Sequence, residues 1–86
     1  MTEVEIYTQF WCPYCARAKQ VFERKGVRYR EIEAPHGSAE RDEAMRRSGG
    51  RNTMPQIFIN GRHIGGCDEL MALDAAGRLD ALLRGT

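Results

Sequence analysis

The chain has 86 residues, of which 42% are hydrophobic and 29% are charged, and its formal net charge is +1 at pH 7. These values are ordinary for a globular protein, so we expect a single domain over residues 1–86, and the near-neutral charge does not favour a nucleic-acid-binding or membrane-binding surface. No apolar stretch approaches the ~20 residues that span a bilayer, and the first residues lack the basic and apolar regions of a signal peptide, so we expect a cytoplasmic protein.

The first part of the chain predicts a strand, a helix and a second strand. A β-branched run indicates a strand over Val4–Thr8, and apolar residues at helical spacing indicate a helix from Pro13 to about Lys25, which Gly26 ends. The second strand is predicted over residues 27–32. A right-handed crossover would make the two strands parallel. The helix residues expected to be buried are Cys15, Ala18 and Phe22.

The middle of the chain predicts a helix with little apolar surface. Residues 35–37 break the preceding strand, and Ser38 is a suitable N-cap for a helix over Ala39–Arg47. Because Ala44 and Met45 are nearly its only apolar residues, we expect this helix to lie across one sheet face with much of its length exposed.

A hairpin and two helices are predicted for the last part of the chain. Gln56–Ile59 has high β-propensity, Asn60-Gly61 is a strong hairpin signal, and Arg62–Ile64 returns as the antiparallel partner. The predicted order is therefore an α/β fold with two parallel strands followed by a hairpin. The closing helices are expected from Cys67 or Asp68 to about Ala76 and over Leu79–Leu83.

The predicted site is centred on two cysteines in the run Trp11-Cys12-Pro13-Tyr14-Cys15. Because Pro13 suits the first position of a helix, Cys12 is expected at the N-cap, where unpaired N–H groups and the helix dipole favour a thiolate. Cys15, one turn inside the helix, should lie deeper and remain a thiol. Trp11 is expected to cover the Cys12 sulfur and to shape a substrate groove.

Two cysteines at this spacing also supply half of a zinc site. A closed site needs two more ligands, and the remaining candidates, Cys67, His36 and His63, are not paired at a zinc-binding spacing. We therefore expect thiol chemistry at the pair and no metal. Cys67 is expected to be a packed thiol.

Three motifs occur together in this chain: Cys12-Pro13-Tyr14-Cys15, Thr53-Met54-Pro55 and Gly65-Gly66-Cys67-Asp68. With these motifs on these elements, the chain resembles a glutaredoxin over nearly its whole length. The resemblance implies a thioredoxin fold, with a four-stranded mixed sheet of two parallel strands and a C-terminal antiparallel hairpin, flanked by helices. It also implies an enzyme that uses glutathione to reduce protein disulfides and glutathione mixed disulfides.

The resemblance assigns roles to the two cysteines and to the middle motif. Cys12 matches the family's nucleophile, and Cys15 matches the resolving cysteine that completes protein-disulfide reduction. Pro55 matches a cis-proline that leaves the Met54 backbone free to pair with an extended thiol peptide. Thr53 and Met54 would then line a glutathione groove, and Tyr14 would form one wall.

The resemblance also indicates how the two ends of glutathione would be held. Asp68, with backbone N–H groups around Gly66 and Cys67, matches the site for the γ-glutamyl end. Many family members carry a lysine three residues before the nucleophile, and this chain has Gln9 there. The predicted contacts of the glycine carboxylate are therefore Gln9 itself, Arg51 or Gln56.

The expected partners are glutathione and disulfide-bearing or glutathionylated proteins, with ribonucleotide reductase among the clients of relatives, and we expect a monomer. Two alternatives belong to the same resemblance. One is a module that binds an iron–sulfur cluster through Cys12 and two glutathiones, against which Pro13 argues. The other is an electron donor recharged by thioredoxin reductase.

Overall fold

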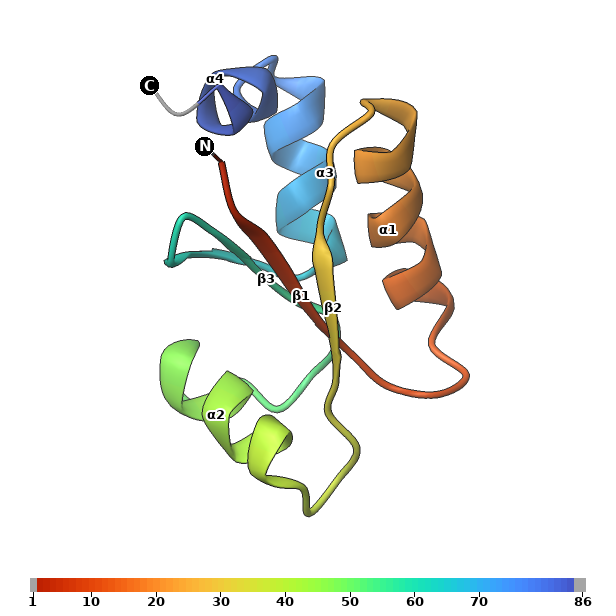
Figure 1. The fold of residues 1–86 in the computed structure, drawn as a ribbon, viewed down its shortest axis with the longest axis vertical. Helices are drawn as coiled ribbons and strands as arrows, with labels where there is room; N and C mark the ends of the chain where they lie inside the picture. The colour runs from red at the N-terminus through yellow and green to blue at the C-terminus, as the bar shows by residue number, and fades with distance from the viewer. Residues whose placement is uncertain (1, 85–86) are drawn as a thin grey trace.

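The computed structural model describes residues 2–84 and contains a four-stranded sheet with the strand order β2-β1-β3-β4 (Figure 1). Strand β1 (Val4–Thr8) pairs in parallel with β2 (Arg30–Glu33) and antiparallel with β3 (Gln56–Ile59). Strand β4 (Arg62–Gly65) pairs antiparallel with β3. The predicted mixed sheet, with two parallel strands and a C-terminal hairpin, is confirmed.

Helices cover both faces of this sheet. Helix α1 (Pro13–Arg24), helix α3 (Cys67–Ala75) and helix α4 (Leu79–Leu83) pack together on one face, and helix α2 (Ala39–Arg47) lies on the other (Figure 1). Within residues 2–84, no helix combines the length and the apolar character that crossing a bilayer requires. The result is a three-layer arrangement in which the end of β1 leads into α1.

The larger core lies between the sheet and helices α1, α3 and α4. Ile6 of β1 and Ile57 of β3 are directly opposite each other in the antiparallel pairing, so their side chains point to the same side of the sheet. They meet Phe22 of α1 and Leu70 of α3, and all four side chains are fully buried. This packing fixes α1, and therefore its N-terminus, against the sheet.

The smaller core explains how the polar helix α2 can cover a sheet face. Tyr7 and Phe58 pack edge to face, with ring centroids 5.7 Å apart. The guanidinium of Arg47 lies 4.0 Å from the Phe58 ring centroid, and its Nη2 is 2.9 Å from Oε1 of Glu5. Helix α2 has few apolar residues to cover this face of the sheet. The Arg47 guanidinium, paired with Glu5, covers the Phe58 ring in their place, because a guanidinium can stack on an aromatic ring.

Strand β2 begins later than predicted, at Arg30 instead of at residue 27. The backbone N–H of Val27 donates to the Phe22 carbonyl at 3.0 Å, so this segment closes the end of α1 before it enters the sheet. Val27 and Tyr29 pack against the larger core. Their alternating pattern therefore reflects core packing and not strand pairing.

Candidate active site

The Cys12 sulfur lies at the N-terminus of α1. Cys12 is the N-cap of the helix and Pro13 is its first residue, as predicted. Its Sγ accepts a hydrogen bond from the backbone N–H of Cys15 at 3.2 Å and lies 3.7 Å from the carbonyl oxygen of Met54. Since the first N–H groups of a helix have no acceptor within the helix, they are available to stabilise negative charge on this sulfur.

Cys15 has a different environment from Cys12. It is 3% exposed and packs in the smaller core, whereas Cys12 is half-buried. Burial, followed by the hydrogen bond with Cys12, raises the pKa of Cys15 from 9.0 to about 12. The prediction that Cys15 lies deeper is therefore confirmed by its burial, and the direction of the pKa shift favours the thiol form that was predicted.

The Met54–Pro55 peptide bond is cis, and the Met54 carbonyl oxygen lies beside the Cys12 sulfur. The neighbouring Gln56 is fully buried, and its Nε2 donates to the Thr53 carbonyl oxygen at 2.9 Å. On its other side, the Gln56 Oε1 lies 2.7 Å from Nε2 of His63. Gln56 therefore fixes the Thr53 backbone through a hydrogen bond from a buried side chain, and this side chain is not exposed to solvent.

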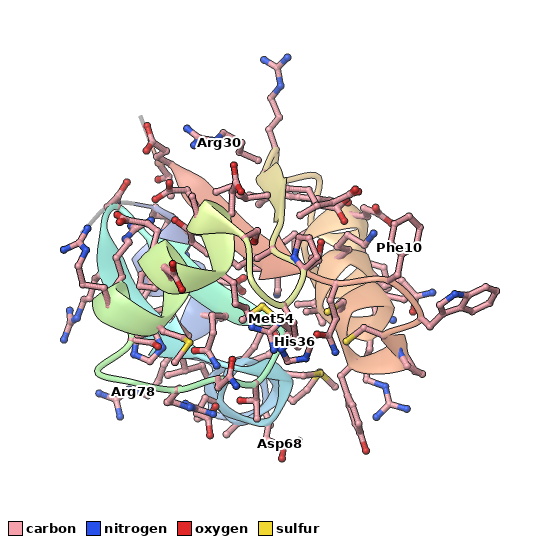
Figure 2. All side chains as sticks on the ribbon, turned by 90° about the horizontal axis from the view of Figure 1, so that it is seen from below. Phe10, Arg30, His36, Met54, Asp68 and Arg78 are labelled. Carbon is pink, nitrogen blue, oxygen red and sulfur yellow. The ribbon has the colours of Figure 1, made fainter. Side chains whose placement is uncertain are left out.

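A cavity of about 270 Å³ lies between this loop and the start of α3. In Figure 2, Met54 lies near the middle of the view, and Asp68 points outward at its lower edge. All seven residues that were predicted to bind glutathione line this cavity, which we call the groove. Its lining residues are Tyr14, Arg51, Thr53, Met54, Pro55, Gly66, Cys67, Asp68 and Glu69.

Two glycines leave room for the close packing at the start of α3. Gly65 has a φ of +125°, and a Cβ there would lie 2.6 Å from Oε1 of Glu69. A Cβ on Gly66 would lie 3.2 Å from the Pro55 carbonyl oxygen. A side chain at Gly65 would therefore collide with Glu69, and one at Gly66 would crowd the loop at Pro55.

Glu69 and Arg51 also line the groove, and the sequence motifs did not include Glu69. Its Oε1 accepts from the Gly66 N–H at 2.6 Å and lies 3.3 Å from Nη1 of Arg51. The Gly66 hydrogen bond, followed by Arg51, holds the pKa of Glu69 below its ordinary value. The only signal in the sequence was the position of Glu69 three residues after Gly66, which is the spacing of a helix capping interaction.

The three predicted contacts of the glycine carboxylate lie in different places. Arg51 lines the groove at its α3 end. Gln9 does not line it, and its Oε1 accepts from Nη1 of Arg41 at 2.8 Å. Gln56 is buried beneath Thr53. The structure therefore brings only Arg51 of these three to the groove.

Arg41 is a residue that sequence reasoning missed. Although it belongs to the polar helix α2, it is only 3% exposed. Its guanidinium donates to Gln9, to the Ala34 carbonyl at 2.9 Å, and to both the side chain and the carbonyl of Asn52, at 2.9 and 2.7 Å. It thus joins the loop that precedes Cys12 to the loop that precedes Thr53. No motif or periodicity indicated this role.

Trp11 does not cover the Cys12 sulfur, so that prediction was wrong. Its side chain is 96% exposed, and its backbone φ of +53° turns the side chain into solvent. A positive φ is uncommon for a bulky residue, and sequence patterns give no indication of it.

The third cysteine is a packed thiol. Cys67 is 5% exposed, and burial raises its pKa above the ordinary value, although Arg17 opposes the shift. Among residues 2–84, no three histidine, cysteine or acidic side chains are placed to share a metal ion. Of the three free thiols, Cys12 has the greatest exposure.

Comparison with known proteins agrees with the motifs and the geometry. A family model described as Glutaredoxin matches residues 4–64. The chain belongs to the glutaredoxin family. It is 55% identical to glutaredoxin 3 of Escherichia coli strain K12 over 84 residues, which is 98% of this chain and 100% of that protein. A glutaredoxin of Pseudomonas aeruginosa is 54% identical over 83 residues, 96% of this chain and 98% of its own length.

Solved glutaredoxin structures share the fold. The solution structure of a glutaredoxin from Brucella melitensis matches with a TM-score of 0.83 and 54% identity, over 96% of this chain and 89% of that one. A complex of buckwheat glutaredoxin with glutathione matches with a TM-score of 0.85 and 31% identity, over 98% of this chain and 78% of that one. With its Cys12–Cys15 pair, the chain is a dithiol glutaredoxin, a glutathione-dependent disulfide oxidoreductase.

Proposed function

We propose that Cys12 is the nucleophile of this glutaredoxin and that it acts on mixed disulfides through its position at the start of α1. The Cys12 thiolate attacks the glutathionyl sulfur of a glutathionylated protein, and the protein leaves as a thiolate that takes a proton from water. A second glutathione, as its thiolate, attacks the glutathionyl sulfur on Cys12. This step forms glutathione disulfide and regenerates the Cys12 thiolate.

Cys15 is the resolving thiol for protein disulfides. When Cys12 attacks a protein disulfide, one protein cysteine leaves as a thiolate. Cys15 then gives its proton to water and attacks the Cys12 sulfur, which forms the Cys12–Cys15 disulfide and releases the second protein cysteine as a thiolate. Both protein thiolates take protons from water. Two glutathiones then reduce this disulfide to the two thiols of Cys12 and Cys15 and are themselves oxidised to glutathione disulfide. The raised pKa of Cys15 supports this order of events, because a protonated Cys15 does not compete with Cys12 for the first attack.

The groove is the proposed glutathione site. Its lining by Tyr14, Thr53, Met54 and Pro55 supports binding of an extended thiol peptide next to the Cys12 sulfur. The glutathione complex of the buckwheat relative also supports it.

The γ-glutamyl end of glutathione is assigned to the start of α3. There the carboxylate would meet helix N–H groups after Gly66, at Cys67 and Asp68, and the ammonium would meet the Asp68 carboxylate. Arg51 lies at this same end, close to Gly66, so we assign it to the γ-glutamyl carboxylate. A contact between Gln9 and the glycine carboxylate stays a prediction.

The protein partners are disulfide-bearing or glutathionylated proteins, and the site of action is the cytoplasm. A transient Cys12–Cys15 disulfide suits a reducing compartment, where cysteine pairs of this kind work as catalysts and not as permanent cross-links.

A coupled assay tests the proposal. The mixed disulfide of glutathione and 2-mercaptoethanol is supplied with NADPH and either glutathione plus glutathione reductase or thioredoxin reductase alone. We expect NADPH oxidation to depend on glutathione. Equal turnover with thioredoxin reductase alone would contradict the assignment of glutathione as the electron donor.

A further inference from the structure

A second cavity, also about 270 Å³ in volume, borders both Cys12 and Cys15. It shares no lining residue with the groove. Its walls come from the loop before Cys12, the first turns of α1 and the edge strand β2. The reactive sulfur is therefore flanked by two cavities. The groove assigned to glutathione is one of them, and Gln9, a predicted contact of the glycine carboxylate, lines the other.

Two exposed aromatic side chains form the rim of the second cavity. Phe10 is 82% exposed and Trp11 is 96% exposed, and both line it. Figure 2 shows Phe10 on a different side of the molecule from Asp68, which lines the groove. Adjacent exposed aromatic residues are costly in water, and sparsely populated backbone conformations such as that of Trp11 occur preferentially at binding sites.

The charged wall of this cavity has a surplus of negative charge. Lys19 Nζ lies 3.2 Å from Oε2 of Glu31, which also accepts from the Thr8 hydroxyl at 2.8 Å. Glu33 lines the same cavity and forms no salt bridge within residues 2–84. Because side chains alternate along β2, Arg30 faces the other side of the sheet, where it lines a separate cavity near α2.

We propose that the second cavity docks the polypeptide segment next to the reacting cysteine of a client protein, and that it selects segments with lysine or arginine there. A cation would pair with Glu33 and lie against the faces of Phe10 and Trp11, where aromatic rings attract positive charge. The client class is thus a basic disulfide-bearing polypeptide. This inference rests on the proposed role of Cys12 as nucleophile.

Two glutathionylated peptides test this selection. They are identical except that the cysteine is flanked by lysines in one and by glutamates in the other. The mixed disulfide of glutathione and 2-mercaptoethanol, which has no polypeptide, is the reference. At low ionic strength we expect kcat/KM for the basic peptide to exceed that for the acidic peptide by about 5-fold. Neither the net charge of the chain nor Arg51 would produce this preference. The net charge is only +1, and Arg51, which is close by, would favour the acidic peptide.

Matched charge reversals locate the source of the preference. Glu33→Lys should bring the ratio of basic to acidic kcat/KM to about 1 or below, whereas Glu40→Lys, the same change on the exposed surface of α2, should leave the ratio as in the wild type. Trp11→Ala should lower kcat/KM for the basic peptide relative to the reference substrate.

Three outcomes would overturn the inference: no basic preference in the wild type, an unchanged ratio in Glu33→Lys, or an equal change in both reversals. The reference substrate distinguishes a failure of the docking proposal from a failure of the proposed function of Cys12. If the wild type does not turn over the reference substrate, the role of Cys12 fails, and the docking proposal fails with it. If the reference is turned over without any charge preference between peptides, only the docking proposal fails.

Discussion

Nη1 of Arg41 donates a hydrogen bond of 2.8 Å to Oε1 of Gln9 and so joins helix α2 to the loop that carries Cys12. The same guanidinium binds Asn52, directly before the loop that contributes Thr53 and Met54 to the groove. The two loops on either side of the reactive sulfur therefore share one buried anchor.

Replacing this anchor should destabilise the fold. Arg41→Met keeps the length of the side chain but leaves the carbonyls of Ala34 and Asn52 without their donor, so we expect the free energy of unfolding to fall by about 3 kcal/mol. Urea denaturation measures the change. Arg46→Met is the matched control, because Arg46 is exposed and its only ion pair within residues 2–84 is with the exposed Glu43 on its own helix. Equal losses in the two variants would remove Arg41 from the role of anchor.

The two cysteines should separate in function. We expect Cys12→Ser to lose all turnover, because no other exposed thiol can attack, and Cys15→Ser to lose the reduction of protein disulfides while it retains most activity on glutathione mixed disulfides. Parallel assays with insulin and with a glutathionylated peptide measure this split. A similar loss of both activities in Cys15→Ser would show that the resolving role is wrong.

Asp68 should act on glutathione binding more than on the chemical step. Its carboxylate is exposed at the start of α3, away from the reacting sulfur, so Asp68→Ala should raise the KM for glutathione by about 10-fold and lower kcat much less. Steady-state kinetics at varied glutathione concentration measure both constants. Asp42→Ala, in the first turn of α2, controls for the loss of one acidic side chain. An unchanged KM would exclude Asp68 from the site.

Cys15 should make the fold sensitive to alkaline pH. Because the pKa of Cys15 is raised from 9.0 to about 12, the folded protein retains a proton that the unfolded chain loses above pH 9. This contribution to stability is complete below pH 9 and is lost as the pH rises toward 12, so the wild type should lose about 1 kcal/mol more than Cys15→Ser between pH 9 and pH 10. Urea denaturation at the two pH values measures the difference. Tyr29, whose pKa is raised in the same direction, is present in both proteins and does not contribute to it.

The sequence predicted the elements that short-range chemistry determines. Cys12 and Pro13 together specify the start of α1, and Asn60-Gly61, both with positive φ, specify the hairpin. Ser38 caps α2 as expected, because its Oγ accepts a hydrogen bond from the Arg41 N–H. Each of these features depends on residues that are close together in the chain, so a sequence motif is enough to predict it.

The features that were missed depend on long-range contacts. Arg41 is polar and lies on a weakly apolar helix, and only the folded loops reveal its acceptors. Gln56 was a candidate for substrate contact, but pairing of β3 with β4 places His63 next to it and buries its side chain. The exposure of Trp11 follows from a backbone conformation that no residue pattern encodes.

The two edge strands of the sheet carry charged residues. Edge strand β2 carries Arg30, Glu31 and Glu33 at three of its four positions, and the opposite edge strand β4 begins with Arg62. Charged edge strands resist pairing with a second copy of the chain, which is a common route to aggregation. Concentrated protein should therefore associate through oxidation of its thiols before it associates through its backbone, and a reducing agent alone should keep it dispersed.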